Sequence, residues 1–152
     1  MRALVQRVTS AGVEVSGEIL GRIGRGLLVY VGVAPDDTTD YAHRLAEKVA
    51  GLRIFEDEAG KMNLSVQDVG GDVLAVPNFT LMADARRGRR PSFATSAAGP
   101  VAQPLYEEFV VALVSLGCRA ARGSFGAHMH VTSVADGPVN LVVDFPPAAD
   151  LP

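Results

Sequence analysis

The sequence predicts an α+β fold, in which largely antiparallel or mixed β-sheets form a barrel- or roll-like body with two covering helices. Three observations predict it. The first residues alternate polar and apolar side chains between close turns, which is typical of β-hairpins. Apolar residues recur at helical spacing in two later segments. Residues 27–31 are continuously apolar, which indicates a central strand that is covered on both faces.

The first half of the chain predicts strands around one helix. Residues 2–9 and 12–16 are predicted strands joined by a tight turn at 10–12, and residues 19–23 continue the meander. A helix is predicted from about 38 to 50, because Tyr41, Leu45 and Val49 form one apolar stripe and Gly51 can end it. Residues 52–55 are a predicted short strand, and 56–61 a charged, solvated turn.

The second half predicts the other helix and the remaining strands. After a turn at 70–72, the buried strand 73–76 is expected to run on into 77–81, so Thr80 is a predicted strand residue. Residues 83–99 lack either period and are a predicted exposed loop. A helix follows Pro100 and ends near Gly117, and its expected apolar stripe consists of Leu105, Phe109, Ala112 and Leu116. Further strands are predicted at about 118–122, 128–134 and 139–145.

Length and composition predict one soluble domain. The 152 residues carry a net charge of −3, so RNA contact would have to come from a local basic patch. The hydrophobic share of 48% is high for this size, and an apolar homodimer interface would account for part of it. We expect a domain over 1–147, a flexible tail over 148–152, no membrane segment and a cytoplasmic location. The one cysteine, Cys118, is expected to be buried rather than nucleophilic.

Familiar cofactor and catalytic signatures are missing from the sequence. The glycine-rich run 21–26 has neither the dinucleotide-binding order nor the end of a phosphate-binding loop. No nucleophile elbow surrounds Ser92 or Ser124. His128 and His130 could share one strand face, but no third ligand stands at a recognisable spacing, so we expect no metal and no cofactor.

Two further segments allow two interpretations each. The first carries the densest charge of the chain, and it is either a solubilising loop or a set of phosphate contacts; its arginines are Arg86, Arg87, Arg89 and Arg90. The second is Gly137-Pro138, which is either an ordinary turn or a rigid cis peptide.

Five segments in a fixed order resemble the D-aminoacyl-tRNA deacylase (D-tyrosyl-tRNA deacylase) family over nearly the whole chain. They are residues 1–8 (MRALVQRV), 52–57 (LRIFED), 78–81 (NFTL) followed by 88–93 (GRRPSF), 125–129 (FGAHM) and 136–139 (DGPV). The resemblance implies hydrolysis of the ester between a D-amino acid and the terminal adenosine of tRNA, which is chiral proofreading of translation. It also implies action on glycyl-tRNA mischarged on tRNA-Ala.

The same resemblance implies where the site lies. Gly137-Pro138 would be a cis peptide whose carbonyls enter the neighbouring subunit's pocket and hold the substrate's α-amino group, so that an L-residue clashes with backbone. Arg7 would fix this loop. Phe125 and Met129 would line the adenosine pocket. The site would therefore lie at or near a homodimer interface.

Ester hydrolysis requires stabilisation of an oxyanion, for which the backbone N–H groups around Phe79 and Thr80, beside Asn78, are the candidates. Thr80 would act as a nucleophile or would position water. We favour positioning, with the ribose hydroxyl of the tRNA and a bound water doing much of the chemistry, because no base stands nearby in the sequence.

Departures from the family pattern leave a second interpretation open. Pro77-Asn78 stand where Ser-Gln is usual. In the second motif, Ala135 stands where Asn is usual, and Asn140 follows Gly-Pro-Val where Thr is usual. These changes bear on D-selectivity and rate. The alternative is a deacylase of altered specificity, or a non-catalytic tRNA-binding paralogue.

Overall fold

A computed structural model describes residues 1–146. Its principal sheet is mixed and has the strand order β2-β1-β3-β6-β7, with β8 paired to β1. The antiparallel members are β1 (Arg2–Val15), β2 (Glu18–Ile23), β3 (Gly26–Gly32) and β8 (His130–Asp144), whereas β6 (Asp72–Pro77) runs parallel to β3 and to β7 (Arg119–Arg122). A small hairpin joins β4 (Phe55–Glu56) to β5 (Met62–Leu64). The predicted mixed, nearly barrel-shaped sheet with two helices is confirmed.

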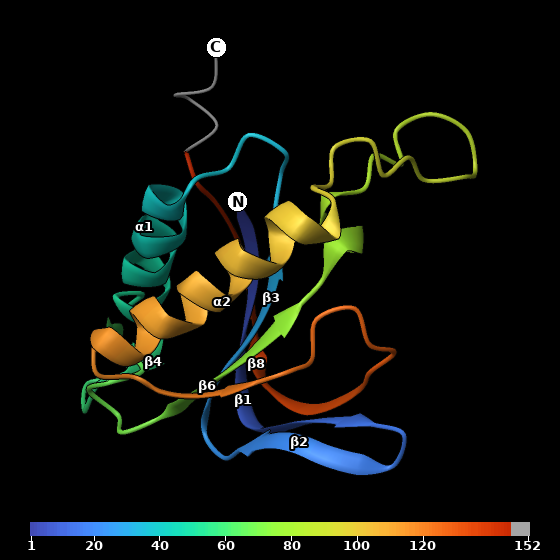
Figure 1. Cartoon of the computed structure of the whole chain (residues 1–152). Coiled ribbons are helices and arrows are strands. Elements are labelled where there is room, and N and C mark those ends of the chain that lie inside the picture. Colours follow the sequence, from blue (N-terminus) through green and yellow to red (C-terminus); the bar gives the residue numbers. More distant parts are fainter. Residues whose placement is uncertain (147–152) are drawn as a thin grey trace.

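The two helices lie together over one face of the sheet (Figure 1). Helix α1 (Thr39–Ala50) begins at Thr38, whose hydroxyl accepts a hydrogen bond from the Tyr41 N–H, and it ends at Gly51 as predicted. Helix α2 (Gly99–Ser115) buries Leu105, Phe109 and Ala112. Leu116 was predicted to extend that stripe, but it follows the helix and is 40% exposed, because the chain turns away at Gly117.

Two apolar clusters lie on opposite faces of the central strands. Leu27 and Val29 pack with the helices, whereas Leu28 packs with Val8 and Leu74 on the other face. Strand β3 is therefore buried on both sides, as its apolar run predicts. Cys118 is buried at 5% exposure, and burial raises the pKa of its thiol, which opposes use as a thiolate nucleophile.

Three element boundaries differ from prediction. The expected turn at 10–12 is absent, because β1 is one strand whose pairing with β8 continues through it. The predicted strands 128–134 and 139–145 are likewise one strand, β8, interrupted opposite Arg7. The predicted strand 52–55 shrinks to β4 at 55–56. The tail predicted at 148–152 lies outside the described residues.

Candidate active site

The segment after β6 turns sharply at the end of the sheet. A 3-10 helix, η1 (Phe79–Met82), replaces the predicted strand, so Thr80 lies on a turn and not on a strand. The Asn78 N–H donates to the Val31 carbonyl at 2.8 Å, which fixes the start of the turn. The turn packs closely on β3, because a Cβ added to Gly32 would lie 2.8 Å from the Met82 side chain.

The first two residues of η1 lie at the surface of the protein. Phe79 is 58% exposed, and Thr80 is exposed too. The first hydrogen bond of the turn runs from the Leu81 N–H to the Asn78 carbonyl at 3.3 Å. The N–H groups of Phe79 and Thr80 precede it and are available to an oxygen of a substrate.

The Thr80 hydroxyl donates to the Asn78 side-chain oxygen at 2.6 Å. An amide oxygen is not a base, so this contact orients the hydroxyl without activating it as a nucleophile. Within the described residues the hydroxyl has no hydrogen bond to a histidine or carboxylate. The geometry therefore favours the positioning role over the nucleophilic one.

The loop after η1 folds back over it. The rings of Phe79 and Phe93 lie 5.2 Å apart, and the Ser96 hydroxyl donates to the Phe79 carbonyl at 3.3 Å. Asp84 and Ser92 exchange two backbone hydrogen bonds of 2.8 Å, which close the segment that carries the arginines. The arginine segment thus starts and ends beside the turn.

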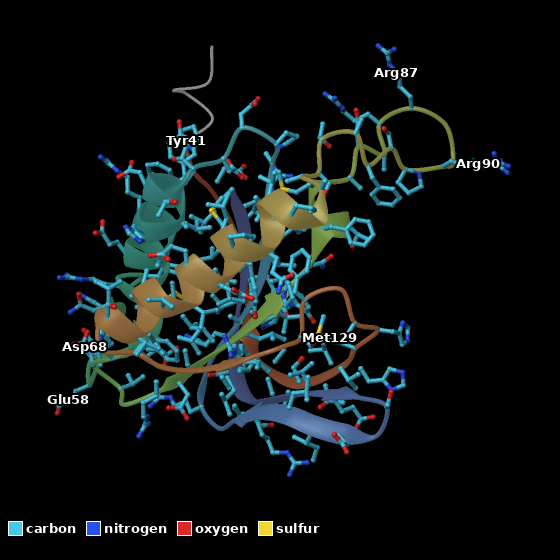
Figure 2. The ribbon with its side chains drawn as sticks, in the orientation of Figure 1. Tyr41, Glu58, Asp68, Arg87, Arg90 and Met129 are labelled. Atoms are coloured by element: carbon cyan, nitrogen blue, oxygen red, sulfur yellow. The ribbon has the colours of Figure 1, made fainter. Side chains whose placement is uncertain are left out.

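The four arginines do not share one environment. Arg86 forms a bidentate salt bridge with Asp84, in which Nε donates to Oδ1 at 2.9 Å and Nη2 donates to Oδ2 at 2.7 Å. This salt bridge holds the pKa of the Asp84 carboxyl well below its usual range. Arg87 and Arg90 extend from the loop tip into solvent (Figure 2), and Arg89 is exposed as well.

A second group of predicted residues lies where β8 leaves the ladder. Gln6 pairs with Asn140 and Val8 with Ala135, so residues 136–139 form an excursion opposite the single residue Arg7. The Gly137-Pro138 peptide within it is cis, and Gly137 has φ +133°. Both residues of this peptide are exposed.

Arg7 ties this excursion to the core. It is 6% exposed, donates to the Asp136 carbonyl at 3.1 Å and to the Ile54 carbonyl at 2.6 Å, and lies 3.3 Å from an Asp136 carboxylate oxygen. The Ile54 carbonyl thus pairs with Arg7 immediately before β4 begins.

One chain does not bring the excursion and η1 together. Arg7 pairs with Leu27, whereas Pro77, just before η1, pairs with Val31. Leu27 and Val31 are four residues apart on β3, so the excursion and the start of η1 are separated by about 13 Å along the strand direction alone. Within one chain the excursion and η1 therefore lie at different levels of the sheet.

Phe125 and Met129 come from the loop that follows β7. Their loop is fixed to β6 through Gly123, whose N–H donates to the Ala75 carbonyl at 2.8 Å. A Cβ on Gly123 would lie 2.7 Å from the Met129 sulfur and 3.3 Å from a Pro77 ring carbon. The predicted adenosine residues therefore border the strand that leads into Thr80.

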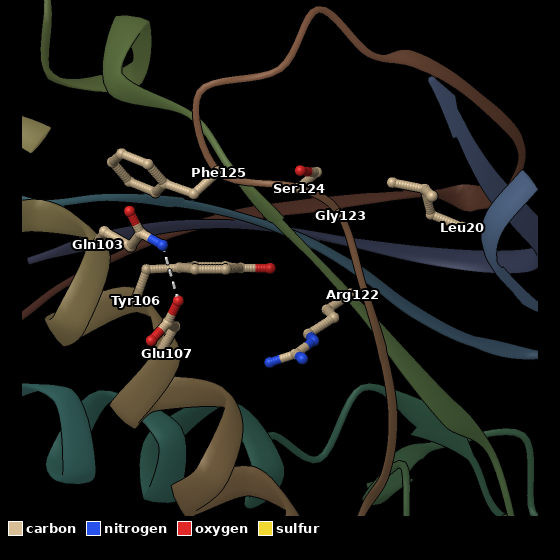
Figure 3. A pocket seen from close by; sticks show the side chains of 8 residues that line it. All are labelled: Leu20, Gln103, Tyr106, Glu107, Arg122, Gly123, Ser124 and Phe125. Carbon is tan, nitrogen blue, oxygen red and sulfur yellow. Dashed lines mark hydrogen bonds between the residues drawn. The ribbon is translucent and has the colours of Figure 1, made fainter. Parts of the chain in front are cut away.

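Sequence reasoning missed a polar cavity beside Phe125. It has a volume of about 370 Å³ and lies between α2 and the end of β7, opposite Leu20 of β2 (Figure 3). Its lining also includes Gln103, Tyr106, Glu107, Arg122, Gly123 and Ser124. The one available signal was the spacing of Gln103 and Glu107, which places both on one face of a helix. Arg122 stood in no recognisable motif.

The structure also bears on the metal and membrane predictions. Among residues 1–146 no cluster of three potential metal ligands is present, and the rings of His128 and His130 lie 5.4 Å apart. No helix in the described part of the chain is long and apolar enough to cross a bilayer.

Fold and site together define a small α+β protein. It has a turn, η1, with backbone N–H groups at one end of a mixed sheet, and an exposed glycine-proline excursion within strand β8. The chain belongs to the D-Tyr-tRNA(Tyr) deacylase family, whose pattern matches residues 4–144. D-aminoacyl-tRNA deacylases of Koribacter versatilis and Desulfatibacillum aliphaticivorans are 56% and 54% identical over 144 residues. The matches cover 95% of this chain and 97% and 99% of those proteins. A solved structure titled c-Myc DNA Unwinding Element Binding Protein is 37% identical, with a TM-score of 0.90 over 97% of this chain and 100% of that one.

Proposed function

We propose that this protein hydrolyses the ester bond of D-aminoacyl-tRNA and so proofreads translation in the cytoplasm, where its substrate is used. The observation that carries the proposal is family membership over residues 4–144. The exposed N–H groups at the start of η1 supply the oxyanion contacts that ester hydrolysis needs.

The proposed chiral filter belongs to a second copy of the chain. In a homodimer, the partner's copy of the Gly137-Pro138 excursion would enter the pocket beside η1, and the separation of the two segments within one chain supports this arrangement. Strand β8 supports such an interface, since it pairs with β1 along one side only and exposes Val134 and Val142 at 57% and 61%. A long exposed edge strand with apolar side chains is a surface that proteins usually cover.

Backbone carbonyls of the excursion would hold the substrate's α-amino group, and the side chain of an L-residue would collide with them. Such a filter does not depend on which D-side chain is present. Glycine has no side chain to reject, so glycyl-tRNA mischarged on tRNA-Ala is a proposed further substrate.

In the proposed reaction, water attacks the ester carbonyl and the bond between the acyl carbon and the ribose oxygen breaks. The neighbouring ribose hydroxyl of the tRNA relays the proton of the attacking water to the departing ribose oxygen, so that the free amino acid and a ribose hydroxyl are released. The N–H groups of Phe79 and Thr80 stabilise the oxyanion, and the Thr80 hydroxyl, held by Asn78, positions the water. Phe125 and Met129 receive the terminal adenosine, and the exposed arginines at the loop tip, including Arg87, contact phosphates of the tRNA. No cofactor is needed.

The test measures release of D-tyrosine and L-tyrosine from charged tRNA by the wild type, by Thr80→Val and by Thr80→Ser. The wild type is expected to release D-tyrosine selectively. A positioning role predicts a loss of about 100-fold in Thr80→Val, substantial recovery in Thr80→Ser and no acyl-enzyme after rapid quenching. A trapped acyl-enzyme would refute the positioning role.

The non-catalytic alternative is motivated by the residues at 77, 78, 135 and 140. It predicts tight, salt-dependent tRNA binding without hydrolysis of any D- or L-ester. That result would refute the hydrolase proposal.

A further inference from the structure

The polar cavity beside Phe125 adjoins the candidate active site through one carbonyl group. The Ala75 carbonyl accepts from the Tyr106 hydroxyl at 3.0 Å and from the Gly123 N–H at 2.8 Å. Tyr106 and Gly123 line the cavity, and Ala75 precedes Asn78 by three residues, or about 10 Å of strand. The cavity therefore lies within one nucleotide's reach of the proposed ester.

The walls of the cavity carry opposite charges. Gln103 donates to one Glu107 carboxylate oxygen at 2.9 Å, which leaves the other oxygen available. Arg122 extends from β7 toward the side of the cavity that α2 forms (Figure 3), and within residues 1–146 its guanidinium has no salt-bridge partner. One acid and one base give no net charge. A phosphate would be repelled by Glu107, whereas the edge of a nucleobase that presents both a donor and acceptors matches the pair.

We propose that this cavity binds the base of the nucleotide that precedes the terminal adenosine of tRNA, a cytosine. The inference rests on the proposed function, which places the adenosine beside Phe125 and Met129. Glu107 accepts from the exocyclic amino group of cytosine, and Arg122 donates to its ring nitrogen and carbonyl oxygen. Phe125 borders both nucleotides and offers a ring on which a base stacks.

The volume is consistent with this occupant. About 370 Å³ lies at the lower end of the range of about 300–1,000 Å³ for ligand pockets, so the cavity suits one small ring system. Uracil presents a carbonyl oxygen where cytosine presents an amino group. It would therefore place an acceptor against the Glu107 carboxylate.

The experiment uses full-length tRNAs that differ only in this nucleotide. They are made by ligating D-tyrosyl pCpA, pUpA or pGpA to one tRNA shortened by two nucleotides. For the wild type, kcat/KM is expected to be about tenfold higher with cytosine than with uracil or guanine, the size of one lost base contact. In Glu107→Gln the ratio of cytosine to uracil is expected to fall close to one, because a glutamine amide can serve either base.

The matched control is Glu108→Gln, the same substitution at the next position. Glu108 lies 2.6 Å from His43 of α1 and outside the cavity, so this variant should keep the wild-type ratio. Equal wild-type rates on the three tRNAs, an equal or higher rate with guanine, or an unchanged ratio in Glu107→Gln would each overturn the inference. Failure to hydrolyse any of these D-esters would overturn the proposed function itself.

Discussion

Alanine at Gly137 tests whether the excursion of β8 acts through the position of its backbone. Gly137 has φ +133°, a conformation that L-residues rarely adopt. An added Cβ would lie 2.8 Å from the Val139 nitrogen and 2.9 Å from a Val139 methyl carbon. The first of these is backbone, so the loop has to shift. Backbone strain of this kind costs about 1–3 kcal/mol, and we expect the free energy of unfolding to fall by about 2 kcal/mol.

The effect on activity should exceed the effect on stability. A shift approaching 1 Å in a group that positions substrate can lower the rate by about 100-fold. We therefore expect kcat/KM for D-tyrosyl-tRNA to fall by about 100-fold in Gly137→Ala. Urea unfolding at fixed protein concentration gives the stability, and single-turnover deacylation gives the rate.

Gly60→Ala is the matched control. Gly60 also has a positive φ, +73°, but an added Cβ would meet nothing within 4 Å, and the residue lies in the charged turn between β4 and β5. This variant should lose about 1 kcal/mol of stability and keep full activity. If Gly137→Ala is folded and as active as Gly60→Ala, the excursion does not position substrate and the reasoning fails.

Three further predictions concern the pH dependence, the arginine loop and the interface. Burial raises the pKa of Tyr106, so its contribution to stability is complete below the unfolded-state pKa of about 10 and declines by up to about 1.4 kcal/mol per pH unit above it. Tyr106→Phe removes this decline and, near pH 8, lowers the free energy of unfolding by about 1 kcal/mol through the lost hydrogen bond to Ala75. Urea unfolding should show the stabilities of the wild type and the variant converging above about pH 10. A constant difference between them would contradict the predicted loss of stability with rising pH. Replacing Arg87 and Arg90 by alanine should make the slope of log affinity for tRNA against log salt less negative by about 1.4, and an unchanged slope would exclude phosphate contact by this pair. Val142→Asp should shift the protein from dimer to monomer in sedimentation velocity with loss of deacylation, whereas an active monomer would refute the shared site.

Local patterns predicted the helices and the central strand, because those elements depend on side-chain periodicity. The continuity of β1 depends on its partners: β1 pairs with β3 up to Val8, with β2 from Ala11, and with β8 along most of its length. Ser10 and Gly12 resemble a turn locally, but the distant β8 keeps them extended. No local pattern carries that pairing.

The candidate site likewise has one part that the sequence shows and one part that only the fold brings together. The motif around Thr80 was recognisable in sequence, yet its aromatic and β-branched residues favoured a strand. The structure makes it a turn because η1 packs on Gly32, 48 positions earlier in the chain. The cavity of Glu107 and Arg122 joins a helix to a distant strand, so only the fold brings its residues together.

Pro77, the clearest departure from the family pattern, fits the geometry of β6. Because the Asn78 N–H donates to Val31 of β3, and alternate N–H groups of a strand point to opposite neighbours, an N–H at position 77 would point toward β7. The pairing of β6 with β7 ends at Ala75 and Arg122, so the missing donor of Pro77 breaks no ladder hydrogen bond. The proline ring instead lies beside Gly123, where an added Cβ would lie 3.3 Å from a ring carbon and 2.7 Å from the Met129 sulfur. The substitution therefore leaves the N–H groups of η1 in place, and its expected effect is on how closely the adenosine fits beside Met129 rather than on the ability to hydrolyse the ester.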